Sequence, residues 1–476
     1  MRGRRGVLQN IGILTIGQVL GQLLSVVALV FLADHLGPRW FGVVQIGVTL
    51  MAYALIVGEW GMMSVGIREV ARLDDIASVR AYVREHVGLM AVQAVALVGL
   101  GLLVLPRLPF YDEDPVVFLL YLVAVVPQVF LLHWVAVGLE HMTWVGAAKT
   151  SRPLIYAILV LTLLVPLERA TGIAPQRLVP AFYLVALAGA GAVIAIPLVR
   201  WFGRYPWPRW PGRTEARRRW REATPIAASI AVLRVLMNVD VLVLGLLASP
   251  VVVGNYAAAA RVIALVMVAI EVLWAALLPR FSRLAKHDPV GFDRALNLYF
   301  GCILAGLLPI AVGGALVAPD LMGLLYGDQF PEAGAVFRVL AVSTALLAAG
   351  TFLGNTLISE DRQTRYLPAV VVGAVVAVVG TAVLIPRFGG IGASYGMAAS
   401  QALLFVWMLV VRLRRFTRTL AVAVAGFVGA VAVMATVVVV TEPWHVLVRI
   451  ALAAAVYGGL ALVPLRTLVR RSARLG

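Results

Sequence analysis

The chain is a series of apolar runs, each about twenty residues long, separated by short polar or basic stretches. A helix of that length crosses about 30 Å of hydrocarbon. Strand-like alternation of apolar and polar residues is absent, so the pattern does not favour a β-barrel. The runs predict an all-α integral membrane protein with about fourteen transmembrane helices. The predicted spans are 11–34, 41–66, 83–105, 116–138, 153–167, 178–199, 224–247, 254–279, 295–318, 333–358, 366–386, 389–411, 418–440 and 446–466.

Composition agrees with this pattern. Hydrophobic residues make up 62% of the 476 positions and charged residues 13%, and the mean hydropathy is +0.96. A soluble protein of this size has too much surface for so few charges. The single cysteine, Cys302, lies in an apolar run, so a disulfide within the chain is excluded and a thiol in the core is expected.

The basic residues are distributed unevenly between alternate connections. The N-terminus, the even-numbered connections and the C-terminus hold 31 of the 40 Lys and Arg residues, and the odd-numbered connections hold 7. Cytoplasmic loops carry such an excess, so both termini are predicted to lie in the cytoplasm. The net charge of +17 therefore reflects topology, and no nucleic-acid partner is expected. The N-terminal stretch MRGRRGVLQN resembles the basic region of a signal peptide, but the apolar run behind it is too long, so a retained first helix is predicted.

The longest basic connection, RWFGRYPWPRWPGRTEARRRWRE, covers residues 200–222 and holds eight arginines. Trp and Pro among arginines are typical of a cytoplasmic interfacial segment that rests on anionic lipid, and docking of a partner is the alternative. The segment divides the chain into an N-lobe of six helices, a basic linker, a C-lobe of helices 7–12, and a remainder with helices 13 and 14 and a basic tail. These parts are predicted at 1–199, 200–223, 224–411 and 412–476.

A weak internal repeat supports two pseudo-symmetric lobes. Placing Gly42 on Gly254 aligns the second predicted helix with the eighth without gaps. Because each repeat has six spans, both lobes enter the membrane in the same direction, and a pseudo-twofold axis along the membrane normal is a known transporter plan. The other matched pairs are Pro38 and Pro250, Ala52 and Ala264, Glu59 and Glu271, and Arg68 and Arg280.

Polar residues interrupt the first two predicted helices. Such residues are costly in the membrane and usually face a cavity or a partner. The residues are Gln18, Gln22 and Ser25 on the first helix and Gln45, Thr49 and Glu59 on the second. Each set falls on one helix face, and the second set lies within an arc of roughly 80°. A hydrated cleft is one interpretation, and interhelical hydrogen bonds in a packed bundle are the other.

Charged residues also interrupt the seventh and eighth predicted helices. Asp240 and Arg261 are expected at similar depth on antiparallel neighbours, so a structural ion pair is favoured over cavity lining. Arg234 is expected near mid-membrane, with Asn238 one turn further on the same face. A guanidinium at that depth is favourable only beside water, an anion or an acid, so Arg234 is predicted to line a cavity, with a structural pair as the alternative.

Sequence patterns for catalysis and for metals are missing. The six histidines are scattered without paired spacing, and no Gly-rich phosphate loop precedes a Lys. We therefore expect no enzyme, no metal and no cofactor. The outward connections are short, which argues against a membrane polysaccharide polymerase or ligase.

Several segments carry a resemblance that covers residues 10–411. They are LADHLGPRWFGVVQ, GEWGMMSVGIREVAR, NVDVLVLGLLASPVVVGNYAAAARV, LLYGDQFPEAGAVFRVLAVS and IPRFGGIGASYGMAAS. In this order the chain resembles the polysaccharide-biosynthesis (Wzx-type) oligosaccharide flippases of the multidrug/oligosaccharidyl-lipid/polysaccharide (MOP, MATE-like) exporter superfamily. The positions that meet the family pattern are Leu36, Gly37, Phe41, Gly42, Glu59, Gly61, Arg68, Asp240, Gly254, Tyr256, Ala259, Arg261, Tyr326, Gly327, Phe330, Pro386, Gly389, Gly392 and Ala393.

The chain departs from the family at Glu59, where an Asp or Asn often precedes the glycine. It matches neither the arginine pattern that lipid II flippases use for diphosphate nor the cation site of the drug-exporting branch. These differences leave the role of Glu59 open.

The resemblance implies a flippase that moves an undecaprenyl-diphosphate-linked oligosaccharide from the inner to the outer leaflet of the bacterial cytoplasmic membrane. Its partners would be that lipid-linked oligosaccharide, membrane lipid, a coupling proton or sodium ion, and polymerase or glycosyltransferase machinery. The expected substrate-binding residues are Arg234, Arg261, Asn238, Gln18, Gln22 and Gln45, and the expected ion-coupling residues are Glu59, Asp240 and Glu271. The alternatives are a lipid II flippase, a cation-coupled drug exporter and, from a different class, a membrane polysaccharide polymerase or ligase.

Overall fold

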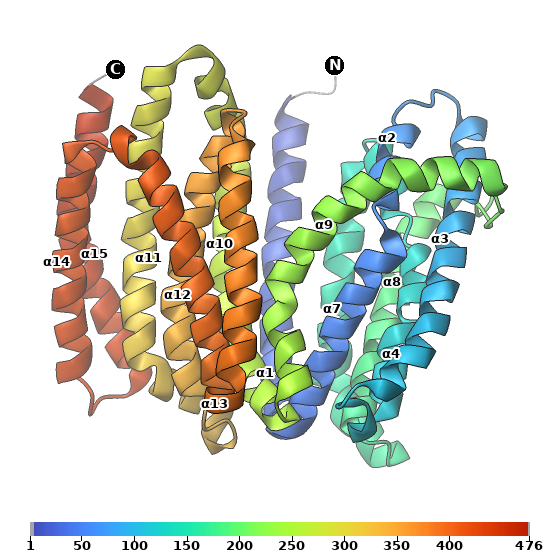
Figure 1. Ribbon diagram of the computed structural model, residues 1–476, viewed down its shortest axis with the longest axis horizontal. Coiled ribbons are helices and arrows are strands. Elements are labelled where there is room, and N and C mark those ends of the chain that lie inside the picture. Colours follow the sequence, from blue (N-terminus) through green and yellow to red (C-terminus); the bar gives the residue numbers. More distant parts are fainter. Residues whose placement is uncertain (1–3, 475–476) are drawn as a thin grey trace. The chain divides into compact units, whose positions relative to one another are not determined.

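A computed structural model describes the backbone of residues 4–474. It describes side chains over the same range except 4–20, 22, 23, 229–238, 268, 271, 272, 275 and 472–474. The described chain is helical without strands, which confirms the predicted all-α class (Figure 1). It divides into two compact units, Met1–Gly254 and Asn255–Gly476.

The first unit contains α1 to α9 and the start of α10. The helices are α1 Arg4–Glu59, α2 Met62–Val70, α3 Ile76–Val104, α4 Pro115–Val123, α5 Val125–Val129, α6 His133–Gly138, α7 Met142–Thr171, α8 Pro175–Phe202 and α9 Arg213–Leu247, with 3₁₀ turns η1 Leu105–Arg107 and η2 Tyr111–Glu113. Capping starts two of them, because the side chains of Asp75 and Asp114 accept hydrogen bonds from the first-turn amides of Ser78 and Val116. Trp134 lies fully buried in the apolar core of this unit.

The second unit continues α10, Pro250–His287. Its other elements are α11 Pro289–Tyr326, η3 Gly327–Gln329, α12 Ala333–Ser359, α13 Gln363–Arg412, η4 Leu413–Arg415, α14 Arg418–Val440 and α15 Val446–Arg474. Buried phenylalanines from α10, α11 and α12 form one core. The last two helices pack on α11 in a second core, where the hydroxyl of Tyr457 donates to the carbonyl of Ala305 at 2.6 Å.

Eleven helical stretches of the described residues are long and apolar enough to cross a membrane. Two of them join a pair of predicted spans across a kink, one at Gly37 (φ 68°) in α1 and one at Gly389 (φ 54°) in α13. Glycine adopts a positive φ without steric cost. A proline close to each kink, Pro38 or Pro386, also interrupts the helical hydrogen bonds. The chain is a multi-pass membrane protein, and the count of fourteen crossings stays a prediction.

Two predicted transmembrane spans differ from the structure. The span 41–66 ends at Glu59 because Trp60 and Gly61 have positive φ, and 116–138 breaks into α4, α5 and α6 around Pro127. The predicted linker 200–223 is helical from Arg213 onward, and α9 clusters with the first unit. The lobe boundaries themselves stay a prediction.

The internal repeat has a structural counterpart inside the first unit. A Cβ atom on Gly42 would lie 1.9 Å from the carbonyl oxygen of Pro250, and one on Gly254 would lie 1.9 Å from that of Pro38. These are repeat-related positions in reciprocal contact, as a local twofold relation requires. Only glycine permits this approach, so the two helices cross with their backbones almost touching.

Candidate functional site

The first unit contains a partly open cavity of about 570 Å³ among helices of membrane-spanning length. Its lining combines apolar side chains with a small set of charged and polar ones, as binding sites commonly do. The charged residues and the one histidine of this lining are Glu59 at the end of α1, His133 at the start of α6, and Lys149 and Arg152 on α7. Tyr183 of α8 lies on the same wall.

Lys149 and Arg152 present two cations on one face of α7. They are three residues apart in a continuous helix, so their side chains project in similar directions. The guanidinium carbon of Arg152 lies 5.9 Å from the centre of the Tyr183 ring, which orients it by a cation–π contact. Residues of this type and spacing provide charged donors for an anionic group.

The remaining polar groups surround these cations. The positive charges of Lys149 and Arg152 interact electrostatically with the His133 ring. The Nδ1 atom of this ring lies 3.1 Å from the carbonyl oxygen of Leu131. The charges of Arg152 and Glu59 both interact electrostatically with Tyr183. With one carboxylate against two permanent cations, the cavity carries an excess of positive charge and favours an anion.

Of the residues predicted from sequence, Glu59 lines this cavity. Gln45 is buried in α1 outside the lining, and Asp240 is half-buried on α9, where its carboxylate accepts from the amide of Val241 at 2.8 Å. Arg261 is half-buried on α10 in the second unit, so the predicted pair with Asp240 stays a prediction. The side chains of Gln18, Gln22, Arg234, Asn238 and Glu271 lie outside the described residues.

Sequence reasoning missed Lys149, Arg152 and His133. The stretch KTSR has low hydropathy, so the fifth span was predicted at 153–167 and the two cations were counted with a cytoplasmic connection. Instead α7 begins eleven residues earlier, at Met142. The three-residue spacing of the two cations close to the start of the apolar run was the available signal.

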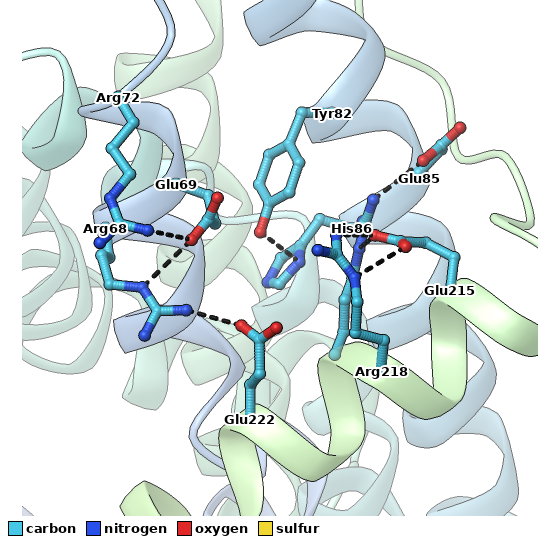
Figure 2. A network of polar contacts seen from close by, with 10 residues as sticks. Arg68, Glu69, Arg72, Tyr82, Glu85, His86, Glu215, Arg218 and Glu222 are labelled. Carbon is cyan, nitrogen blue, oxygen red and sulfur yellow. Dashed lines mark hydrogen bonds and ion pairs between the residues drawn. The ribbon is translucent and has the colours of Figure 1, made fainter.

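Charged residues at one end of the first unit hold α9 in place against α2 and α3 (Figure 2). Arg68 of α2 pairs with Glu222 of α9 at 2.6 Å. Arg219 of α9, buried, pairs with Glu85 of α3 at 2.9 Å and with Glu215 at 2.7 Å. Since Ala227 of α9 lines the cavity, these ion pairs also position one of its walls.

The same network sets the protonation of its half-buried acid Glu215. The hydrogen bond from Arg218, followed by that from Arg219, holds the pKa of Glu215 below its usual value, while burial opposes the shift. Glu215 is therefore ionised at neutral pH and available to both arginines.

Residues 7–285, more than half of the chain, match the family described as polysaccharide biosynthesis protein. The chain belongs to this family. It is also 24% identical, over 164 residues, to the probable low-salt glycan biosynthesis flippase Agl15 of Haloferax volcanii. That match spans about a third of each protein, 34% of this chain and 35% of the relative.

Solved structures show the fold of this member of the polysaccharide biosynthesis family. The lipid II flippase MurJ in an inward closed conformation has a TM-score of 0.76 at 11% identity, covering 96% of this chain and 99% of that chain. An inward-facing multidrug resistance MATE family transporter of the MOP superfamily has a TM-score of 0.62 at 14% identity, covering 83% and 94%. A MOP superfamily transporter from Pyrococcus furiosus has a TM-score of 0.51 at 15% identity. That match covers 85% of this chain and 94% of the transporter. The fold is therefore of the MurJ and MATE type, which confirms the predicted resemblance.

Proposed function

We propose that this protein is a flippase that moves an undecaprenyl-diphosphate-linked oligosaccharide from the inner to the outer leaflet for surface polysaccharide synthesis. The observation that carries the proposal is the cavity of about 570 Å³, with Lys149 and Arg152 on one face of α7. Membership of the polysaccharide biosynthesis family and the similarity to a glycan biosynthesis flippase support it. On this proposal the protein is a transporter and not an enzyme.

The diphosphate needs a polar environment during its passage. A sugar-diphosphate head group in hydrocarbon would lose its hydrogen bonds to water at a cost of several kcal/mol per polar group. Arg152 offers a planar fork for bidentate contact with phosphate oxygens, and Lys149 offers a compact second charge. Arg234 and Arg261 stay candidates for the same role. The side-chain amides of Gln18, Gln22, Gln45 and Asn238 stay candidates for the sugar hydroxyls.

Glu59 lies in the same cavity as the two cations. Its position makes it the leading candidate for the group that binds a coupling proton or sodium ion, and Asp240 and Glu271 stay candidates. Binding of the diphosphate and of the ion would then change the same local field, which couples one to the other. Transport would proceed by alternating access of two lobes.

Complementation of a bacterial strain that lacks its polysaccharide flippase tests the proposal. The wild-type chain should restore surface polymer, and the Lys149→Ala/Arg152→Ala variant should not, at equal membrane abundance. The control removes the same two residue types outside the cavity, as Arg283→Ala/Lys286→Ala, both exposed on α10. Full polymer from the cavity variant would overturn the assignment of the anion site.

The alternatives make different predictions in related strains. Both candidate substrates carry a polyprenyl diphosphate, so the rescued pathway separates them. A lipid II flippase would rescue peptidoglycan synthesis in place of surface polysaccharide. A cation-coupled drug exporter would confer resistance to organic cations, which two cavity cations disfavour. Deletion of a polymerase or ligase would leave lipid-linked repeat units on the outer leaflet. Deletion of a flippase would leave them on the inner leaflet.

A further inference from the structure

The first turns of α9 carry a basic surface that lies outside the cavity. Arg213, Arg217 and Arg221 recur every four residues, so they share one face of the helix. Thr214 and Arg218 lie beside them, and all five side chains are exposed around an open groove of about 790 Å³. We call Arg213, Arg217, Arg218 and Arg221 the arginine face.

The two acids of this segment neutralise only part of its charge, and among the described residues Arg218 is the one member of the arginine face that pairs with an acid, Glu215. Glu222, on the edge of the groove, pairs with Arg68 of α2 at 2.6 Å. Glu215 pairs with Arg218 and with the buried Arg219. Residues 200–222 contain eight arginines and two glutamates, a net charge of +6. The arginine face therefore keeps a strong positive potential at the surface.

Tryptophans accompany the arginines on the same segment. Trp207, Trp210 and Trp220 are 69%, 48% and 39% exposed. Exposed tryptophan next to arginine is typical of the boundary between membrane and water, where the ring enters the head-group region and the cation meets phosphate. A soluble acidic protein would not require three exposed indole rings beside the charges.

The segment is held rigidly in this orientation. The amide of Arg209 donates to the carbonyl of Arg84 at 2.8 Å, and the guanidinium of Arg84 donates to the carbonyl of Trp207 at 3.2 Å. Arg219, 5% exposed, anchors α9 to α3 on the side opposite the arginine face. Within the first unit, α9 crosses one end of the neighbouring helices and then runs back beside α1 (Figure 1). The arginine face is thus preorganised before any ligand arrives, which lowers the entropic cost of binding.

We propose that the arginine face binds the head groups of anionic phospholipids in the leaflet that borders α9. The lipid anchors the start of this helix, and because Ala227 of the same helix lines the cavity, the anchor also fixes one cavity wall. This site is separate from the cavity cations Lys149 and Arg152, so it does not depend on which lipid-linked substrate the protein carries.

The test places one probe next to the arginine face in the full-length protein. Since Cys302 is the only cysteine, Cys302→Ser followed by Thr214→Cys gives a single labelling site for a fluorophore. The labelled protein is reconstituted in vesicles of phosphatidylcholine with about 30 mol% phosphatidylglycerol, a composition chosen to give a negative surface potential. Either lipid is then replaced by its brominated form, and quenching by each is compared at the same mole fraction.

Brominated phosphatidylglycerol should quench about threefold more strongly than brominated phosphatidylcholine at low salt. The ratio should fall toward one at about 0.5 M salt, where the Debye length is only a few ångströms. The variant Arg213→Gln/Arg217→Gln/Arg221→Gln should give a ratio near one at all salt concentrations. The matched control Arg283→Gln/Arg362→Gln/Arg365→Gln, exposed arginines of the second unit, should keep the wild-type ratio.

Equal quenching by both lipids in the wild-type sequence would overturn the proposal without any variant. So would an unchanged ratio in the triple variant that eluted as folded protein. A ratio that inorganic phosphate abolished at constant ionic strength would assign the site to a free anion instead of lipid. Failure of complementation by Lys149→Ala/Arg152→Ala has no bearing on these outcomes, so the two proposals can fail separately.

Discussion

The two compact units use their interiors differently. In the first unit, charged and polar side chains of α1, α6, α7 and α8 line a cavity of about 570 Å³. In the second unit, Phe281, Phe292, Phe300 and Phe352 fill a core from α10, α11 and α12, with ring centres 5.4 to 6.1 Å apart. Aromatic rings in such arrangements contribute packing energy and leave little space. Among the described residues, the first unit thus has a polar cavity beside its apolar core, whereas aromatic rings fill this part of the second unit.

Charge follows the same division. In the second unit, Arg412 is 2% exposed and pairs with Glu360, and Arg415 joins Glu360 to Asp293. In the first unit, most members of the network in Figure 2 are at least partly exposed, and the cavity cations face open space. The buried ion pairs of the second unit should thus serve stability, whereas the cavity cations Lys149 and Arg152 of the first unit should serve binding.

The largest effect is expected from Arg412→Ala in the second unit. The substitution leaves Glu360 with only the less buried Arg415 as a partner and removes a hydrogen bond of 2.9 Å to Thr356, which should cost about 3 kcal/mol of stability. Thermal unfolding of the detergent-purified protein measures the change. Arg414→Ala, an exposed neighbour, is the control and should unfold like wild type. Equal melting of both variants would show that the buried pair does not stabilise the second unit.

The next effect is expected from Lys149→Gln/Arg152→Gln in the first unit. Two charge-assisted contacts to diphosphate would be lost, so affinity for a short polyprenyl diphosphate should fall about 100-fold, or about 2.7 kcal/mol. Calorimetric titration measures the affinity, and the melting temperature should stay near that of wild type because both residues line open space. A large drop in melting temperature with unchanged affinity would reverse the comparison between the two units.

A smaller change in affinity is expected from Glu59→Gln. If Glu59 binds the coupling ion, the neutral variant should still bind polyprenyl diphosphate, and somewhat more tightly because one negative charge leaves the cavity. Transport into proteoliposomes should lose its dependence on a proton or sodium gradient. Glu332→Gln, an exposed acid of the second unit, should keep that dependence. A gradient dependence preserved in Glu59→Gln would remove this residue from the coupling mechanism.

The smallest effect concerns Glu215 in the exposed network of the first unit. Its pKa is lowered, so its contribution to stability is present above the unfolded value of about 4.3 and is lost as the pH falls through the folded value. Because the pair is partly exposed, the contribution should be below about 1 kcal/mol.

Hydrogen exchange of residues 213–222 measures this contribution. Exchange should accelerate when the pH is lowered from about 6 to below about 4, after correction for intrinsic rates. Glu215→Gln should show faster exchange already at the higher pH and a smaller response to acid. An identical response in both proteins would place the acid sensitivity of this segment elsewhere.

Hydropathy by itself determined the helical class and most of the spans. A helix satisfies every backbone group within one segment, so an apolar run of sufficient length specifies its structure locally. The ordered motifs also predicted the family and the fold, which the match over residues 7–285 and the structural similarities confirmed. Glycine kinks at Gly37 and Gly389 were not predicted, because positive φ leaves no hydropathy signal.

Only the tertiary structure decided which polar residues meet. The sequence predicts Glu59 as a polar residue within its own helix, and it predicts Lys149 and Arg152 in a connection. In the structure α7 begins at Met142, so both cations lie on this helix and line the cavity. Their place in one cavity with Glu59 depends on how α1, α6, α7 and α8 pack, which brings together residues 90 and 93 positions apart in sequence. Helix formation is local, so the periodicity and hydropathy of the sequence predict it. A binding cavity is a non-local arrangement of side chains, and it exists only once the helices have been assembled.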